Sequence, residues 1–241
     1  MFLITFVSIF PEIFPGALSF GLSGKSLGKL WDYRTVDIRE FANDKHRTVD
    51  DTPYGGGAGM IMKPDIIHMA LLKALSFYEN TPQILYMTPH GKTLSQKIVM
   101  EIMEGNDNGI IFLCGRYEGI DQRVIDFWIE NHNMIQISVG DYILFGGEIP
   151  SLIVSDACLR FVRGIMNNSN STEIESFSNN LLEYPQYTKP RVWNNMNVPD
   201  VLISGHHENI DKWKLIQSEK ITQKNRPDLF EKYISSKKSK V

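Results

Sequence analysis

Apolar residues fall into short runs over the first two-thirds of the chain. Mainly apolar runs of strand length occur at residues 2–9, 83–88, 109–114 and 134–138. A further segment, residues 34–41, alternates partly in strand register. Helical spacing occurs between these runs, after Pro64, at residues 94–103 and 122–130, and from Pro150 toward Met166. Strands separated by helices predict an α/β fold, with a mostly parallel sheet flanked by helices.

A polar run without periodicity, NNSNST, begins at residue 167 and is typical of a linker. It leads us to expect an α/β domain of residues 1–166, a linker of residues 167–176 and a small helical domain of residues 177–241. The last part is rich in Trp, Tyr and Lys and ends in the basic run SSKKSK.

The composition is that of a folded protein. Hydrophobic residues make up 42% of the 241 residues, which excludes a disordered chain. No apolar run approaches the roughly 20 residues that cross a bilayer, and the apolar N-terminal run lacks the basic start of a signal peptide. We therefore expect a cytoplasmic protein without a membrane partner. Cys114 and Cys158 have apolar neighbours, so we expect reduced thiols in the core.

The charge is distributed unevenly. A formal net charge of −3, taken alone, argues against a nucleic-acid partner. Residues 1–200, however, carry 16 basic and 23 acidic side chains, whereas residues 201–241 carry 9 basic and 5 acidic ones. The resulting net charges of −7 and +4 indicate two surfaces with different partners.

Three of the predicted strands are followed by glycine-containing loops: TPHGKT at residues 88–93, GRYEGID at 115–121 and SVGDYILFGGEIP at 138–150. In an open parallel sheet the ligand crevice lies at the carboxyl ends of the strands, so these loops should converge on one place. Any single glycine among them is explained equally well as a turn residue. Three such loops at equivalent positions favour a binding site.

Several familiar motifs are missing. No G-x-G-x-x-G follows the first strand, which weakens a dinucleotide-binding interpretation. GLSGKS at residues 21–26 resembles a phosphate-binding loop, but Ser19 stands where the leading glycine belongs, and we expect a flexible loop there. No metal-ligand spacing occurs, so no metal site is predicted.

The segment DDTPYGGGAGM at residues 50–60 has four glycines in five residues. Ordering so many glycines costs much conformational entropy. A tight turn or hinge and a backbone cradle for a nucleotide or partner chain explain this composition about equally well.

Arg160 lies on the predicted helix before the linker, and Glu175 follows the polar run NNSNST. A cation and a carboxylate can stabilise negative charge and remove a proton, respectively. The residues alone favour a solvated surface role for each.

GRYEGID, SVGDYILFGGEIP, PYGGGAGM and ESFSNNLLEYPQYTKP together resemble the bacterial tRNA (guanine-N1)-methyltransferase family, which modifies the guanosine immediately 3′ of the anticodon (position 37). The resemblance extends from MFLITFVSIFPEIF to QSEKITQKNRPDLFEKY. It implies a SPOUT-type methyltransferase whose three loops form a deep trefoil knot around S-adenosyl-L-methionine. It also implies a homodimer, a tRNA substrate and assistance by Mg²⁺.

The resemblance further implies which residues act. Arg160 would face guanine O6, and Glu118 matches a family carboxylate at the cofactor site. Glu175 occupies the position of the family's Asp base, so the carboxylate is kept on a longer side chain, with Glu173 as a nearby competitor. The implied cofactor-binding residues are Tyr86, Met87, Thr88, Pro89, Gly115, Tyr117, Ser138, Val139, Gly140, Asp141, Tyr142, Ile143, Leu144, Gly146, Gly147 and Pro150.

The basic C-terminal part would hold the tRNA. Phosphate contacts are expected from Lys212, Lys214, Lys220, Lys224 and Arg226, with Trp213 as an aromatic surface. A solvated helical face with a core Trp explains the same residues. Two other functions remain possible from the residues: a nucleotide-binding regulatory module without catalysis, and an interaction protein that docks through the glycine-rich loop.

Overall fold

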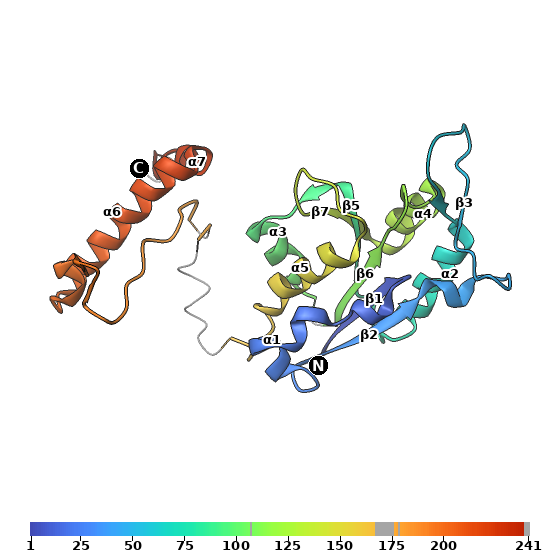
Figure 1. Cartoon of the computed structure of the whole chain (residues 1–241), viewed down its shortest axis with the longest axis horizontal. Coiled ribbons are helices and arrows are strands. Elements are labelled where there is room, and N and C mark those ends of the chain that lie inside the picture. Colours follow the sequence, from blue (N-terminus) through green and yellow to red (C-terminus); the bar gives the residue numbers. More distant parts are fainter. Residues whose placement is uncertain (107, 167–175, 178, 239–241) are drawn as a thin grey trace. The chain divides into compact units, whose positions relative to one another are not determined.

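The computed structural model describes residues 1–106, 108–166, 176–177 and 179–238 (Figure 1). The chain divides into two compact units, Met1–Asn167 and Asn168–Val241. Within the described residues, no helix is both long and apolar enough to span a membrane. The predicted linker, residues 167–176, lies outside the described residues except for Ser176.

The first unit is built on a five-stranded sheet with the order β2-β1-β6-β5-β7. All neighbouring strands are parallel, which confirms the predicted parallel α/β fold. The strands are β1 (Phe2–Ser8), β2 (Trp31–Asp37), β5 (Gln83–Thr93), β6 (Gly109–Cys114) and β7 (Met134–Ser138). β1 pairs with β6 from Leu3↔Gly109 to Val7↔Leu113, so two segments far apart in sequence form the centre of the sheet.

Helices cover both faces of this sheet (Figure 1). On one face, α2 (Pro64–Leu75) and α4 (Gln122–His132) pack against Ile111 and Leu113 of β6. On the other, α3 (Gln96–Met103) and α5 (Glu148–Leu159) pack against Ile110 and Phe112. Successive strand residues therefore enter two different cores, which explains why β6 is apolar without alternation.

Most predicted elements are present, and some of them have shifted ends. Pro64 is in the first turn of α2, and β6 and β7 have the predicted bounds. The helix predicted from Pro150 begins two residues earlier, at Glu148, and stops at Leu159. β2 ends at Asp37 and is followed by a 3-10 turn, Ile38–Phe41, because the Asp37 side chain accepts a hydrogen bond from the Arg39 amide. Cys114 and Cys158 are buried and free, as expected for core thiols.

The flexible loop predicted at GLSGKS is wrong, since these residues form helix α1 (Gly21–Ser26). The Ser23 and Ser26 hydroxyls donate to backbone carbonyls three or four residues earlier and support the turn. A Cβ on Gly24 would lie 2.1 Å from the Ser19 carbonyl oxygen, so the helix needs glycine there. Two 3-10 turns precede it, Pro11–Ile13 and Gly16–Ser19.

The second unit contains two longer helices and a small hairpin. The hairpin joins β8 (Val192–Trp193) to β9 (Met196–Asn197) through two asparagines with positive φ. A 3-10 turn, Asp200–Ile203, leads to α6 (His207–Asn225), and α7 (Pro227–Lys238) follows. The buried Thr222 hydroxyl accepts a hydrogen bond from the Leu182 amide at 2.8 Å, which ties the preceding extended segment to α6.

Candidate active site

A cavity lies at the carboxyl end of β7 and beside the point, after Met87, where β5 stops pairing with β6. The sequence predicted a ligand crevice in this region. The cavity is lined by Met87, Thr88, Pro89, Ile137, Ser138, Val139, Gly140, Tyr142, Leu144, Gly146, Gly147 and Pro150. All of these except Ile137 were expected at the site from the sequence. The cavity therefore gathers residues of the first and third loops.

The loop predicted at residues 88–93 is instead the irregular second half of β5, which runs to Thr93; this first loop leaves the ladder with β7 and then rejoins it. Met87 and Lys92 both lie opposite Ile137, so residues 88–91 form an outward excursion. Gly91 approaches β7 closely, because a Cβ there would lie 2.3 Å from the Ile137 nitrogen. The excursion thus depends on glycine, and it places Thr88 and Pro89 in the cavity wall.

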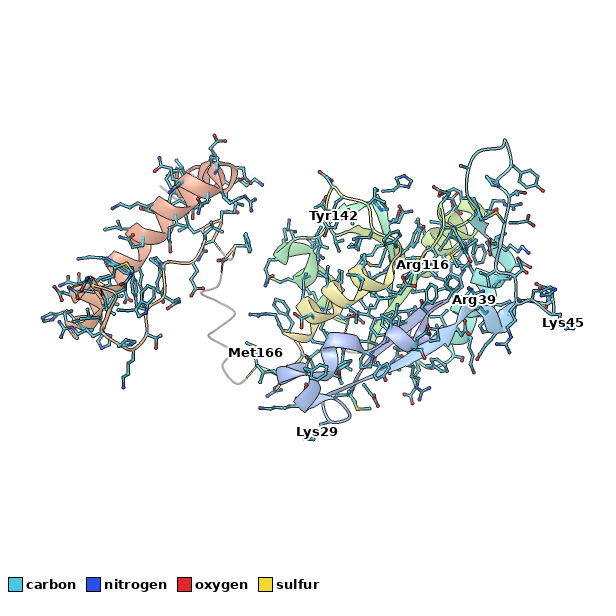
Figure 2. All side chains as sticks on the ribbon, viewed as in Figure 1. Lys29, Arg39, Lys45, Arg116, Tyr142 and Met166 are labelled. Carbon is cyan, nitrogen blue, oxygen red and sulfur yellow. The ribbon has the colours of Figure 1, made fainter. Side chains whose placement is uncertain are left out.

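The third loop begins with a tight turn. The Ser138 hydroxyl accepts a hydrogen bond from the Gly140 amide at 3.2 Å. The Tyr142 amide donates to the Gly140 carbonyl at 2.9 Å, and the Tyr142 hydroxyl donates to the Val139 carbonyl at 3.2 Å. Gly140 has a φ of +138°, which favours glycine. These bonds hold Tyr142 across the turn with half of its surface exposed (Figure 2).

The second loop is attached to the glycine-rich segment. The Glu118 amide donates to the Met60 carbonyl at 3.0 Å, and the Met62 amide donates to the Gly119 carbonyl at 2.9 Å. β3 (Asp50–Asp51) and β4 (Ile61–Met62) pair as an antiparallel ladder at the base of this segment. A Cβ on Gly59 would lie 2.3 Å from the Glu118 side chain. The base of the segment is therefore a scaffold for the second loop, whereas the glycines nearer its tip have open surroundings.

Five of the expected cofactor-binding residues do not line the cavity: Tyr86, Gly115, Tyr117, Asp141 and Ile143. Tyr86 is buried below the loops, where burial raises the pKa of its hydroxyl. A Cβ on Gly115 would lie 3.2 Å from the Tyr86 ring, so these two residues pack together. Tyr117, Asp141 and Ile143 are exposed on the second and third loops.

The three expected catalytic residues are not gathered in the described part of the structure. Glu118 is exposed on the second loop. Arg160 follows the last turn of α5 and lines a separate hollow with Phe20, Leu22 and Asp156. Glu175 and Glu173 lie outside the described residues.

An ion pair beneath the loops was not predicted from the sequence. The Nε atom of Arg116, a residue labelled in Figure 2, donates to Glu148 Oε2 at 2.9 Å, and the Glu148 side chain is 1% exposed. Both residues belong to the motifs GRYEGID and SVGDYILFGGEIP. The available signal was the presence of opposite charges in two loops expected to converge. Nothing in one sequence, however, specifies that they pair.

The described residues contain no group of three or more His, Cys, Asp or Glu side chains placed to hold a metal ion. The cavity is lined instead by apolar side chains, hydroxyls and glycine backbone. A parallel sheet with such a cavity at its carboxyl end is the arrangement of α/β enzymes that bind a nucleotide-like ligand.

Comparisons with known proteins identify the family within this class. The family model for tRNA (Guanine-1)-methyltransferase TrmD matches residues 2–232. A tRNA (guanine-N(1)-)-methyltransferase of Wolbachia pipientis wMel is 48% identical over 239 residues, which cover 98% of each chain. Relatives with the same name occur in Rhodospirillum rubrum, 45% identical over 97% of this chain and 94% of the relative, and in Ehrlichia canis, 48% identical over 92% and 93%. The chain therefore belongs to the tRNA (Guanine-1)-methyltransferase TrmD family, as its motifs indicated.

Proposed function

We propose that this protein transfers a methyl group from S-adenosyl-L-methionine to N1 of the guanosine immediately 3′ of the anticodon in tRNA. The observation that carries the proposal is the match of nearly the whole chain to the family, from residue 2 to residue 232. The cavity at the ends of β5 and β7 provides a place for the methyl donor.

The residues of the cavity suit S-adenosyl-L-methionine, which supplies the methyl group when bound. Glycines at 140, 146 and 147 let the backbone approach a ligand closely, and neighbouring amides and carbonyls can recognise an adenine edge. Met87, Leu144 and Pro150 offer apolar contact for its ring. We assign binding to the lining residues, while Tyr86, Gly115, Tyr117, Asp141 and Ile143 support or border them.

Methylation of guanine N1 requires removal of its proton, because the neutral base carries N1–H. As the N1–CH₃ bond forms and the S–CH₃ bond breaks, this proton passes to a carboxylate, for which we propose Glu175. Negative charge that spreads onto O6 is stabilised by a cation, for which we propose Arg160. Glu118, on the loop beside Gly59, is proposed to orient the reacting groups.

We also propose the trefoil knot of SPOUT enzymes for the first unit. Two contacts support it. After β7, at the edge of the sheet, the third loop returns to β6, where the Gly147 amide donates to the Gly115 carbonyl at 2.9 Å. The first loop, at Gly91, lies against β7 where that return begins. The third loop thus passes β5, which lies between β7 and β6 in the sheet. A knotted path of this kind is rare among protein folds.

A homodimer fits the position of Arg160. Arg160 follows Gly147, which lines the cavity, by 13 positions along α5. At the rise of an α-helix, the backbones of these two residues are roughly 20 Å apart. A second copy is therefore proposed to bring this cation to the cavity. Apolar side chains that a second copy could cover are exposed near the same helix: Ile143 (82%), Phe145 (95%), Ile149 (53%) and Ile153 (43%).

The second unit is proposed to grip the tRNA. Lys212, Lys220 and Lys224 are exposed on α6, where phosphate can reach them. Trp213 is half-buried against Tyr187, with ring centroids 6.3 Å apart, so it serves packing at least in part. Lys214 lies over the Tyr184 ring at 4.9 Å.

The proposal is tested by incubating the protein with labelled S-adenosyl-L-methionine and unmodified tRNA that carries G beside the anticodon, followed by nucleoside analysis. We expect labelled 1-methylguanosine at that position. Cofactor binding without this product would favour a regulatory module, and neither binding nor product would favour an interaction protein. A tRNA with A at the target position is the matched control.

A further inference from the structure

The carboxylate of Glu148 connects three separate parts of the first unit. Glu148 is the first residue of α5, where the helix dipole favours a negative charge. Its Oε1 atom accepts a hydrogen bond from the Ser8 hydroxyl at the end of β1, at 2.6 Å. Its Oε2 atom accepts from Arg116 Nε at 2.9 Å. Because the Glu148 side chain is 1% exposed, these two bonds compensate for the loss of solvation.

Arg116 has further contacts that reach the third loop. Its Nη1 atom donates to the Phe145 carbonyl at 3.3 Å. Its guanidinium lies over the Phe10 ring, 4.6 Å from the centroid, and the Phe10 amide donates to the Ser8 hydroxyl at 2.9 Å. One side chain of the second loop thus bonds to a carbonyl of the third loop and to the buried carboxylate that begins α5.

The third loop lies directly over this arginine. A Cβ on Gly146 would be 2.2 Å from Arg116 Nε, and a Cβ on Gly147 would be 2.7 Å from the Cα of Cys114. The two glycines therefore permit the loop to reach Arg116 and β6. Gly146 and Gly147 also line the cavity, whereas Arg116 and Glu148 do not.

We infer that Arg116 and Glu148 are positioning residues for the methyl donor. They set the spacing between the second and third loops, and so the shape of the cavity wall, without contacting the ligand. This inference rests on the proposed function, because it assigns S-adenosyl-L-methionine to the cavity. If the buried ion pair served stability alone, breaking it would lower the melting temperature and leave the affinity of the folded protein for the methyl donor unchanged.

Arg116→Lys is the decisive variant. Lysine keeps the positive charge, but its single ammonium group lacks the planar fork with which arginine reaches Glu148 and the Phe145 carbonyl together. Glu148→Gln is the second variant, since it keeps the side-chain size and removes the charge. Arg123→Lys is the matched control, because Arg123 forms an ion pair with Asp121 at 2.8 Å on the surface and is not in the cavity wall.

The Kd of S-adenosyl-L-methionine is measured by calorimetry, well below each variant's melting temperature. The steady-state kcat and the KM for S-adenosyl-L-methionine are measured with tRNA as the methyl acceptor. We expect Arg116→Lys and Glu148→Gln to raise Kd and KM for the methyl donor at least tenfold, with a change in kcat below about threefold for Arg116→Lys. Arg123→Lys should leave all three values within twofold of the unchanged protein.

The outcomes separate this inference from the proposed function. If the unchanged protein does not bind S-adenosyl-L-methionine, the proposed function fails and the inference fails with it. If the unchanged protein binds and a folded Arg116→Lys variant binds equally well, only the inference is overturned. Loss of folding in Arg116→Lys also overturns it, because the pair then supports the whole domain rather than the spacing of the loops.

Discussion

Gly91→Ala tests whether the close approach of the first loop to β7 shapes the cavity. The added Cβ would lie 2.3 Å from the Ile137 nitrogen, about 1 Å closer than ordinary contact. Backbone cannot rotate away as a flexible side chain can, so the loop must separate from β7. The neighbouring ladder pairs, Lys92↔Ile137 and Thr93↔Ser138, are then weakened. At about 1 kcal/mol for each backbone hydrogen bond, the free energy of unfolding should fall by roughly 1–3 kcal/mol.

For a unit of this size, that loss corresponds to a fall in melting temperature of roughly 3–10 °C. Thr88 and Pro89 move with the loop, so we expect the Kd of S-adenosyl-L-methionine, measured by calorimetry, to rise at least tenfold. Gly105→Ala is the control, because Gly105 has a φ of +69° and open surroundings. It should cost about 1–2 kcal/mol through backbone strain and leave Kd unchanged. Wild-type affinity in Gly91→Ala would refute the reasoning.

Three further predictions concern catalysis, tRNA binding and pH. Glu175→Gln should lower methyl transfer by roughly 10²–10⁴-fold while cofactor binding persists, and near-normal turnover would remove Glu175 from the role of base. Deletion of the residues after Gly205 should weaken tRNA binding, measured by filter binding, more than cofactor binding; equal losses would contradict separate roles. Burial raises the pKa of the Tyr78 hydroxyl above its ordinary value of 10.0, so the unfolded chain releases this proton first and stability falls as pH rises above 10. Tyr78→Phe should reduce this decline by up to about 1.4 kcal/mol per pH unit in urea unfolding, and an unchanged slope would argue against it.

Strands buried on both faces were the most predictable part of the fold. β6, which is buried along its whole length, has the predicted bounds, because an apolar run of strand length between polar neighbours has few other uses in a protein of this size. The helix at Gly21–Ser26 could not be predicted from local preference. It is supported by serine hydroxyls that bond to the backbone and by the approach of Gly24 to Ser19, both of which depend on the folded path of the chain.

The location of the candidate site could be predicted from the sequence, but the ion pair that holds its loops together could not. Ligands bind at the carboxyl ends of parallel strands, and this rule places the three loops together from the strand pattern alone. The pairing of Arg116 with Glu148 is different, because 32 residues separate the partners. It arises from the path of the third loop back to β6, and neither periodicity nor spacing carries that information. The roles of Glu175, Arg160 and Glu118 remain predictions.

The strand order has a consequence for how the chain is made. β1 lies between β2 and β6, and its register with β6 joins Leu3 to Gly109. During synthesis the first strand must therefore wait for about 100 further residues before its second neighbour exists, which at typical translation rates takes roughly 5–20 s. Throughout that interval the edge of β1 that pairs with β6 has no partner, and Phe6 lacks the Phe112 ring, whose centroid lies 5.5 Å from its own in the folded protein. The nascent chain is thus exposed to aggregation and to chaperone binding until β6 has left the ribosome.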